Sequence, residues 1–280
     1  MTIGLDTLIV SLVFLLVFVC LYFILFKVLK IPDSIRDENS HDKTLRAFWE
    51  YTGNYVSLIH AIISIGLGSY IIFSYELSYF AKNRSVEVNI LAVSFAYFVV
   101  DTIIGLSFGF NDIAMLAHHF MSIVMIGYPI LKGQYANIMI WGLIMGEISN
   151  PFMLTWKNLK TEGKKEISTV FGILFAIIFI LFRTYFLGTI AWPLFSLKVT
   201  LILKLSTGGL WFLSLHWVWI IINSFTKEMY NSTKNKVFGS ILRFLTILRK
   251  SIIFKVLFYS LLFYICFFQT IYKWNHPSIF

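Results

Sequence analysis

Charged residues are scarce in this chain. Asp, Glu, Lys and Arg together make up 13% of its 280 residues, whereas hydrophobic residues make up 58%. An ordinary soluble domain carries about 25% charged residues. The composition therefore excludes a soluble globular domain and predicts a polytopic membrane protein.

Cysteine is also scarce. The two cysteines, Cys20 and Cys266, each lie inside a long hydrophobic run, where a thiol behaves as a small apolar side chain. Two cysteines placed in this way provide neither a disulfide framework nor a cluster of metal ligands. We therefore expect no structural disulfide, no metal site and no bound cofactor.

Long hydrophobic runs account for most of the chain. A helix of about 20 apolar residues crosses a bilayer. Eight runs of that length occur, at residues 8–29, 56–75, 88–108, 113–131, 135–156, 168–194, 201–225 and 252–272. We predict an all-α membrane protein with about eight transmembrane helices.

Two polar segments divide these runs into three parts. Residues 33–50 carry charges of both signs, and residues 227–250 are polar and basic. We therefore expect an N-terminal transmembrane anchor and connection at residues 1–42, a helical core domain at residues 43–230, and a linker with a C-terminal hydrophobic helix at residues 231–280.

The chain has a net charge of +9, from 23 Lys and Arg against 14 Asp and Glu. These basic residues lie mostly in the connections and form no stripe with aromatic residues, so we expect no nucleic-acid partner. If the eight spans cross the membrane in alternating directions, the connections on one side carry 15 of the basic residues and those on the other side carry 6. The positive-inside rule then makes the basic face cytoplasmic or matrix-facing, with both termini opposite it.

Several strongly polar residues lie inside the hydrophobic runs. A charged group at membrane depth costs on the order of 2.5–3.5 kcal/mol, so such groups usually face a cavity or pair with one another. At about 1.5 Å per helical residue, most of them lie about 10–16 Å beneath the basic face. We therefore predict a polar pocket in one layer between the helices, with candidates Asp101, His118, His119, Glu147, Asn150, Arg183, His216 and Asn223.

The adjacent histidines His118 and His119 are the first candidates for chemistry. Consecutive residues of a helix point about 100° apart, so one ring is expected to line the pocket while the other braces it. Asp101 is expected to fix the tautomer of a histidine. Hydrogen bonding to neighbouring helices, with no role in a site, stays an alternative for both rings.

Pro151 predicts a kink in the fifth run. A proline lacks the amide donor and displaces the carbonyl four residues earlier, which belongs to Glu147. Backbone polar groups exposed at membrane depth are tolerated only inside protein or beside water. Glu147, Ser149 and Asn150 are therefore expected to bind a ligand at this kink.

Arg183 lies near the middle of its run. We expect it either to pair with Glu147 or Asp101 or to bind an anionic headgroup, and both roles stay open. His60 shares a helical stripe with two small residues, and it is a further candidate ligand-binding residue together with His216.

Six stretches carry a family resemblance: HAIISIGLGSY, YFVVDTIIG, MLAHHFMSI, MGEISNPFM, LFRTYFLGTI and LHWVWIIIN. In this order they resemble the TLC family, the membrane domain shared by ceramide synthases, translocating-chain-associating proteins and several TLC-domain-containing proteins. The resemblance covers residues 43–230. It implies a TLC-like helical core around a polar-lined lipid cavity.

The stretch after the paired histidines departs from the ceramide synthases. In the ceramide synthases, a histidine–aspartate pair and then a serine–aspartate pair follow one helix after the two histidines. These acidic groups are taken to serve acyl transfer from acyl-CoA to a sphingoid base. Here Glu147 keeps a carboxylate, whereas Asn150 cannot act as an acid or base. The E-x-S-x-P-F core resembles the TLC-domain-containing subgroup more than the true ceramide synthases.

The resemblance and the polar residues together give three functional hypotheses. The first is a protein that binds membrane lipids or supports lipid homeostasis, including as a non-catalytic subunit of a membrane assembly. The second is a lipid acyltransferase with acyl-CoA as co-substrate, in which His118 or His119 is the general base, Asp101 orients it and Glu147 holds the headgroup. The third is a transporter, which the lack of an evident inverted repeat disfavours. The resemblance implies the endoplasmic reticulum, with the mitochondrial inner membrane as an alternative.

Overall fold

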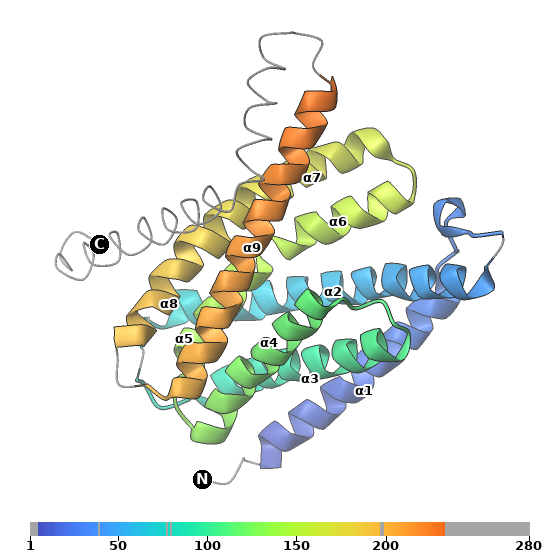
Figure 1. The fold of residues 1–280 in the computed structure, drawn as a ribbon. Helices are drawn as coiled ribbons and strands as arrows, with labels where there is room; N and C mark the ends of the chain where they lie inside the picture. Colours follow the sequence, from blue (N-terminus) through green and yellow to red (C-terminus); the bar gives the residue numbers. More distant parts are fainter. Residues whose placement is uncertain (1–4, 39, 77, 79, 197–198, 233–280) are drawn as a thin grey trace.

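The computed structural model describes residues 5–38, 40–76, 78, 80–196 and 199–232. This part of the chain is helical and contains no β-strand (Figure 1). The predicted run at residues 252–272, and with it the linker and the C-terminal helix, lies outside the described residues. The elements are α1 (Leu5–Val28), η1 (Asp33–Ile35), α2 (His41–Ser74), α3 (Ser85–Ser107), α4 (Ile113–Lys132), α5 (Ala136–Glu147), α6 (Asn150–Thr161), α7 (Lys165–Phe179), η2 (Ile180–Phe186), α8 (Leu187–Ser196) and α9 (Leu201–Ser232).

Seven segments among the described residues are long and apolar enough to cross a membrane. They are Leu5–Val28, His41–Ser74, Ser85–Ser107, Ile113–Lys132, Ala136–Thr161, Lys165–Ala191 and Leu201–Ser224. Each coincides with one of the first seven predicted runs, which confirms the prediction of an all-α, multi-pass membrane protein.

The helices form one bundle around a shared core. α1 packs mainly along α3, α3 packs against α4, and α4 packs against α9. α6 and α7 form an antiparallel pair, and α2 contacts both α5 and α6 (Figure 1). The core is aliphatic and aromatic, with side chains such as Val56, Leu91, Ile126 and Ile140 fully buried.

The short turn between α3 and α4 places the paired histidines beside α3. Asp112 caps α4, because its Oδ1 accepts a hydrogen bond of 2.8 Å from the backbone N–H of Met115. Asn111 folds back over α3 at Gly105, where a β-carbon would lie only 1.9 Å from the Asn111 Nδ2 atom. A glycine is therefore needed at position 105 for this turn to close.

The helix break predicted at Pro151 is present. α5 ends at Glu147 and α6 begins at Asn150, so the fifth span consists of two helices joined at residues 148–149. A proline near the start of α6 needs no amide partner there. The break leaves Glu147 at the end of one helix and Asn150 at the start of the next.

The sixth span contains a second irregularity. Residues Ile180–Phe186, labelled η2, form a π-helical segment between α7 and α8, and Arg183 lies within it. π-helical turns inside α-helices are rare and occur frequently at functional sites. Both irregularities of the bundle therefore carry a charged side chain into its interior.

Candidate functional site

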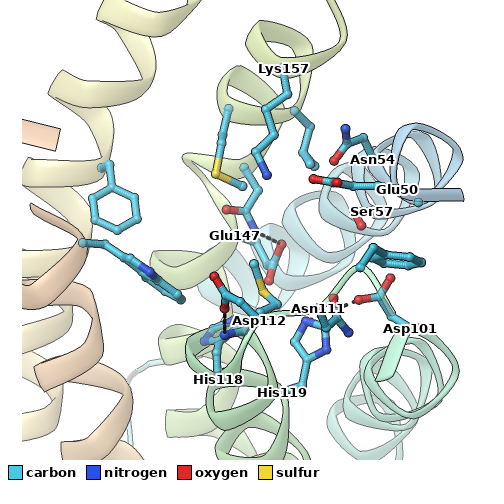
Figure 2. Close-up of a pocket in the computed structure, with 18 of the residues that line it drawn as sticks. Glu50, Asn54, Ser57, Asp101, Asn111, Asp112, His118, His119, Glu147 and Lys157 are labelled. Atoms are coloured by element: carbon cyan, nitrogen blue, oxygen red, sulfur yellow. Dashed lines mark hydrogen bonds and ion pairs between the residues drawn. The ribbon is translucent and has the colours of Figure 1, made fainter. Parts of the chain in front are cut away.

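A cavity of about 410 Å³ lies inside the bundle between α2, α3, α4, α6, α7 and α9. It lies toward the end of the bundle that holds the α3–α4 turn and the C-terminal part of α6. Its volume falls within the range of small-molecule pockets, about 300–1,000 Å³. Polar side chains from four of these helices converge on it (Figure 2). The polar and charged lining residues are Glu50, Asn54, Ser57, Asp101, Asn111, Asp112, His118, His119, Glu147, Asn150, Lys157 and Arg183.

Asp101 and His119 form a buried pair at one side of this cavity. The His119 Nε2 atom lies 3.3 Å from the Asp101 Oδ2 atom, and less than a tenth of either side chain is exposed. The other carboxylate oxygen, Oδ1, accepts a hydrogen bond from the Tyr22 hydroxyl of α1. This contact between α3 and α4 fits both the predicted orientation of a histidine by Asp101 and the alternative of bonding to a neighbouring helix.

The proton positions around His119 follow from its neighbours. The Thr102 hydroxyl donates its proton to the Phe98 carbonyl at 2.6 Å, so its oxygen accepts from the His119 Nδ1–H group at 3.2 Å. The Nε2 atom on the other side of the ring faces the Asp101 carboxyl group at 3.3 Å. Both nitrogens of His119 therefore have a polar group beside them.

His118 is in a different position. Its ring packs edge-on against Trp217 of α9, with a centroid distance of 5.3 Å, and close to Phe98 of α3. Its Nδ1 atom is buried and has no hydrogen-bond partner among the described residues. His118 also lines the cavity. It is therefore a histidine of the cavity wall with a ring nitrogen that no described residue engages.

Glu147 is held where the fifth span breaks. Its Oε2 atom accepts a hydrogen bond of 2.7 Å from the Asn150 side-chain amide and lies 4.0 Å from the His60 Nδ1 atom. The His60 ring lies behind the cavity, stacked on Tyr97 and hydrogen-bonded to Ser64 at 2.9 Å. Asn150 thus positions the carboxylate, although an amide cannot exchange protons with it.

Arg183 reaches the cavity from the π-helical segment with only 4% of its surface exposed. Within the described residues its guanidinium makes no ion pair, and its Nε atom has no hydrogen-bond partner. Arg183 and Glu147 attract each other across the cavity but are not in direct contact, so the predicted pairing with Glu147 and the predicted binding of a headgroup both stay open. The guanidinium packs beside Gly146, where a β-carbon would lie 3.8 Å from its Cζ atom.

The cavity has a polar side and an apolar side. The ionisable groups come mainly from α2, α3, α4 and the α5–α6 break. α7 and α9 contribute mostly apolar and aromatic side chains, namely Phe175, Phe179, Trp217, Ile220 and Ile221. A molecule with a polar head and an apolar tail matches this division.

The structure brings most of the predicted site residues together. Asp101, His118, His119, Glu147, Asn150 and Arg183 all line the cavity. Ser149 and His60 are buried next to it without lining it. His216 is exposed on α9 and does not line it. Counting residues along a helix gives the depth of a side chain in the membrane but not the direction in which it points around the helix axis. The sequence alone therefore could not show that His216 points away from the cavity.

Other lining residues were not predicted. Glu50, Asn54 and Ser57 recur on one side of α2, and Lys157 lies near the end of α6. Their spacing of four and three residues was a usable signal, because polar residues at this spacing share one helix face. Lys157 follows the predicted run at residues 135–156, so the sequence alone does not place it at the cavity.

No group of three or more His, Cys, Asp or Glu side chains within the described part of the chain is arranged to hold a metal ion. The chemistry that this arrangement offers is that of ionisable side chains: two histidines, the cations of Lys157 and Arg183, and the four carboxyl groups of Glu50, Asp101, Asp112 and Glu147. It suits recognition of a polar headgroup or transfer of a proton.

The helices and their buried polar cavity define an integral membrane protein with an internal site. The family model of the TLC domain, TRAM_LAG1_CLN8, matches residues 50–227, and the chain belongs to this family. No curated protein and no solved structure matches the chain. The matched residues begin within α2 and end within α9, whereas α1 lies outside them.

Proposed function

We propose that this protein binds a membrane lipid with an anionic headgroup in the cavity, in support of membrane lipid homeostasis. The observation that carries this proposal is Arg183, a buried cation that lines the cavity and makes no direct ion pair among the described residues, with only a longer-range attraction to Glu147. A charge at membrane depth costs on the order of 2.5–3.5 kcal/mol. An anionic ligand would offset that cost.

Two features support a lipid as the source of the anion. The apolar side of the cavity, formed by α7 and α9, suits an acyl chain. The His118 Nδ1 atom provides a second unsatisfied polar group for the headgroup. A headgroup held between Arg183 and His118 would place the chain against Phe179 and Trp217.

The experiment compares the lipids that co-purify with wild type and with Arg183→Met. Mass spectrometry of the detergent-purified protein should detect an anionic lipid. Its occupancy should fall at least about tenfold in Arg183→Met, because hydrogen bonds to a charged group contribute about 1.5–3 kcal/mol. Arg46→Met, which removes an exposed arginine of α2, is the matched control. Equal occupancy in both variants, or a neutral lipid held equally well, would contradict the proposal.

Acyl transfer is the second candidate function, and the two histidines favour it. His118 has a ring nitrogen that no described residue engages, whereas His119 has Asp101 and Thr102 beside its two nitrogens. In this reaction His118 would take the proton of a lipid hydroxyl or amine as that group attacks the acyl-CoA thioester. The new ester or amide bond forms, the carbon–sulfur bond breaks, and the thiolate of coenzyme A takes up a proton.

Purified protein incubated with acyl-CoA and a lipid alcohol or amine tests this second function. Acylated product should form with wild type and fall about 100-fold or more in His118→Gln, the usual scale of general-base catalysis. His41→Gln, at the exposed start of α2, should keep wild-type activity. Bound lipid without any product would leave binding alone as the function.

The cellular setting stays a proposal from the resemblance. We propose the endoplasmic reticulum as the membrane, with the mitochondrial inner membrane as the alternative. Other membrane subunits are proposed partners in addition to lipids.

A further inference from the structure

The N-terminal helix α1 contributes a side chain to the site, although it lies outside the family-matched residues 50–227. Most of α1 faces outward, with exposed side chains such as Leu12 and Leu16. Phe18 and Tyr22, one turn apart, are the most deeply buried side chains of this helix, with 1% and 0% of their surfaces exposed. This helix is therefore anchored to the bundle by one buried aromatic face.

The Tyr22 hydroxyl lies between α2 and α3. It donates a hydrogen bond to the Oδ1 atom of Asp101. A β-carbon at Gly53 of α2 would lie 3.3 Å from the Tyr22 oxygen, so the absence of a side chain at position 53 leaves room for the hydroxyl. Gly53 itself lines the cavity. The Tyr22 hydroxyl therefore lies next to the cavity wall as well as in the core.

This hydrogen bond restrains the rotation of the Asp101 carboxyl group. With Oδ1 held by Tyr22, Oδ2 faces His119 Nε2 at 3.3 Å. Thr102 holds the opposite ring nitrogen. The contacts therefore run from Tyr22 of α1 through Asp101 of α3 to the His119 ring of α4. A carboxylate beside one ring nitrogen commonly orients a catalytic or metal-binding histidine.

We propose that Tyr22 is a positioning residue of the site: its hydroxyl fixes the Asp101 carboxyl group, which in turn fixes the His119 ring at the cavity. α1 is then part of the site as well as an anchor. The effect on His119 is independent of any ligand, whereas the effect on lipid occupancy rests on the proposed function. A buried tyrosine whose hydroxyl merely finds a partner would leave the state of His119 unchanged.

The test is the side-chain ¹⁵N spectrum of histidine-labelled protein in detergent, compared between wild type and Tyr22→Phe. This substitution keeps the ring and removes the hydroxyl. The ring signals of His119, assigned with His119→Gln, should shift or split because the proton between Nε2 and Asp101 loses its fixed geometry. The signals of His60, which is held by Ser64 and Ser94, should stay in place.

Tyr135→Phe is the matched control. Tyr135 is buried in the connection between α4 and α5 and does not line the cavity. Its loss of a hydroxyl should leave the His119 signals unchanged. Unchanged His119 signals in Tyr22→Phe would overturn the proposal.

Lipid occupancy is the second readout, expected to fall severalfold in Tyr22→Phe at an unchanged melting temperature. If wild type retains no lipid, the proposed function fails while the spectrum still decides the role of Tyr22. If Tyr22→Phe does not fold, Gly53→Ala replaces it. The added methyl group would press on the Tyr22 hydroxyl, and a smaller shift of the His119 signals is expected, whereas no shift would overturn the proposal.

Discussion

Two buried carboxyl groups on the same helix have opposite surroundings. Glu87 lies in the first turn of α3, and Asp101 lies four turns further along. Both oxygens of Glu87 are engaged: Oε2 accepts from the backbone N–H of Arg84 at 2.8 Å, and Oε1 accepts from the Arg84 guanidinium at 2.7 Å and from the Asn137 amide at 3.1 Å. Asn137 in turn accepts from the backbone N–H of Ser78 at 2.9 Å.

The cluster around Asp101 faces a cavity instead. Two other residues that line this cavity, His118 and Arg183, have buried nitrogens without hydrogen-bond partners in the described chain. Glu87 does not line that cavity. The difference shows that a buried charge alone does not indicate a ligand site. Unsatisfied polar atoms next to a cavity do, because leaving them unpaired costs free energy that a ligand can recover.

The largest expected effect comes from removing Glu87, whose two carboxylate oxygens both accept hydrogen bonds. Glu87→Ala should lower the free energy of unfolding by about 3 kcal/mol, because it leaves the Asn137 amide and the Arg84 backbone N–H without their buried acceptor. The measurement is the thermal unfolding midpoint in detergent, with the exposed neighbour Glu76→Ala as the control.

Lipid occupancy per folded molecule should stay at the wild-type level in Glu87→Ala. Arg183→Met is expected to show the reverse, with occupancy lost and stability kept or raised, because it removes a buried charge that makes no direct ion pair within the described residues. Loss of lipid in Glu87→Ala at temperatures where it is folded would show that the two clusters are not separable.

A third carboxylate, Glu162, lies outside the spans and extends the comparison of Glu87 with Asp101. Glu162 lies just after α6, where Lys164 approaches it at 2.7 Å and Tyr51 and Tyr55 donate hydrogen bonds of 3.0 and 2.9 Å. Burial raises the pKa of Glu162, but the hydrogen bonds from Lys164, Tyr55 and Tyr51 outweigh it and hold the pKa below the usual 4.5. This carboxylate is fully partnered, like Glu87, but in contact with water.

The smallest expected effect follows from that lowered pKa. The stabilisation is present above pH 4.5 and is lost as the pH falls through the lower folded-state pKa. Glu162→Gln should therefore lower the stability slightly at pH 7, by less than about 1 kcal/mol, and the difference from wild type should shrink as the pH falls below 4.5 and vanish below the folded-state pKa. Melting curves from pH 7 downward check it, with exposed Glu38→Gln as the control. A difference that does not shrink as the pH falls below 4.5 would contradict this account.

Hydrophobic periodicity and length predict the fold well, because a bilayer leaves few alternatives to helices of fixed length. The positions of seven helices and the break at Pro151 follow from runs of apolar residues and one proline. Glu87 shows the limit. It precedes the predicted run at residues 88–108, whereas the structure buries it in the first turn of α3.

The site is predictable in composition and less so in geometry. Depth along a helix follows from sequence, so Asp101, His118 and Glu147 could be placed in one layer. The direction in which a side chain points around its helix axis depends on packing, which the sequence does not show. For this reason the sequence predicts His216 at the cavity and misses Asn54, whereas the structure places Asn54 there and not His216. Tyr22 gave a weak signal, a hydroxyl inside an apolar run, which identifies neither its partner nor its depth.

The π-helical segment η2 has a consequence for the evolution of the sixth span. A π turn is equivalent to one residue inserted into an α-helix, and each added residue rotates everything beyond it by about 100°. The α7 half directs Phe175 and Phe179 to the cavity, while the α8 half buries Leu187, Ile190 and Ala191. Deleting a single residue within 180–186 would restore a regular helix, yet it would turn one half away from its partners. The segment's length is therefore constrained even where its side chains are exchangeable, and aligned relatives should vary here by substitution and not by deletion.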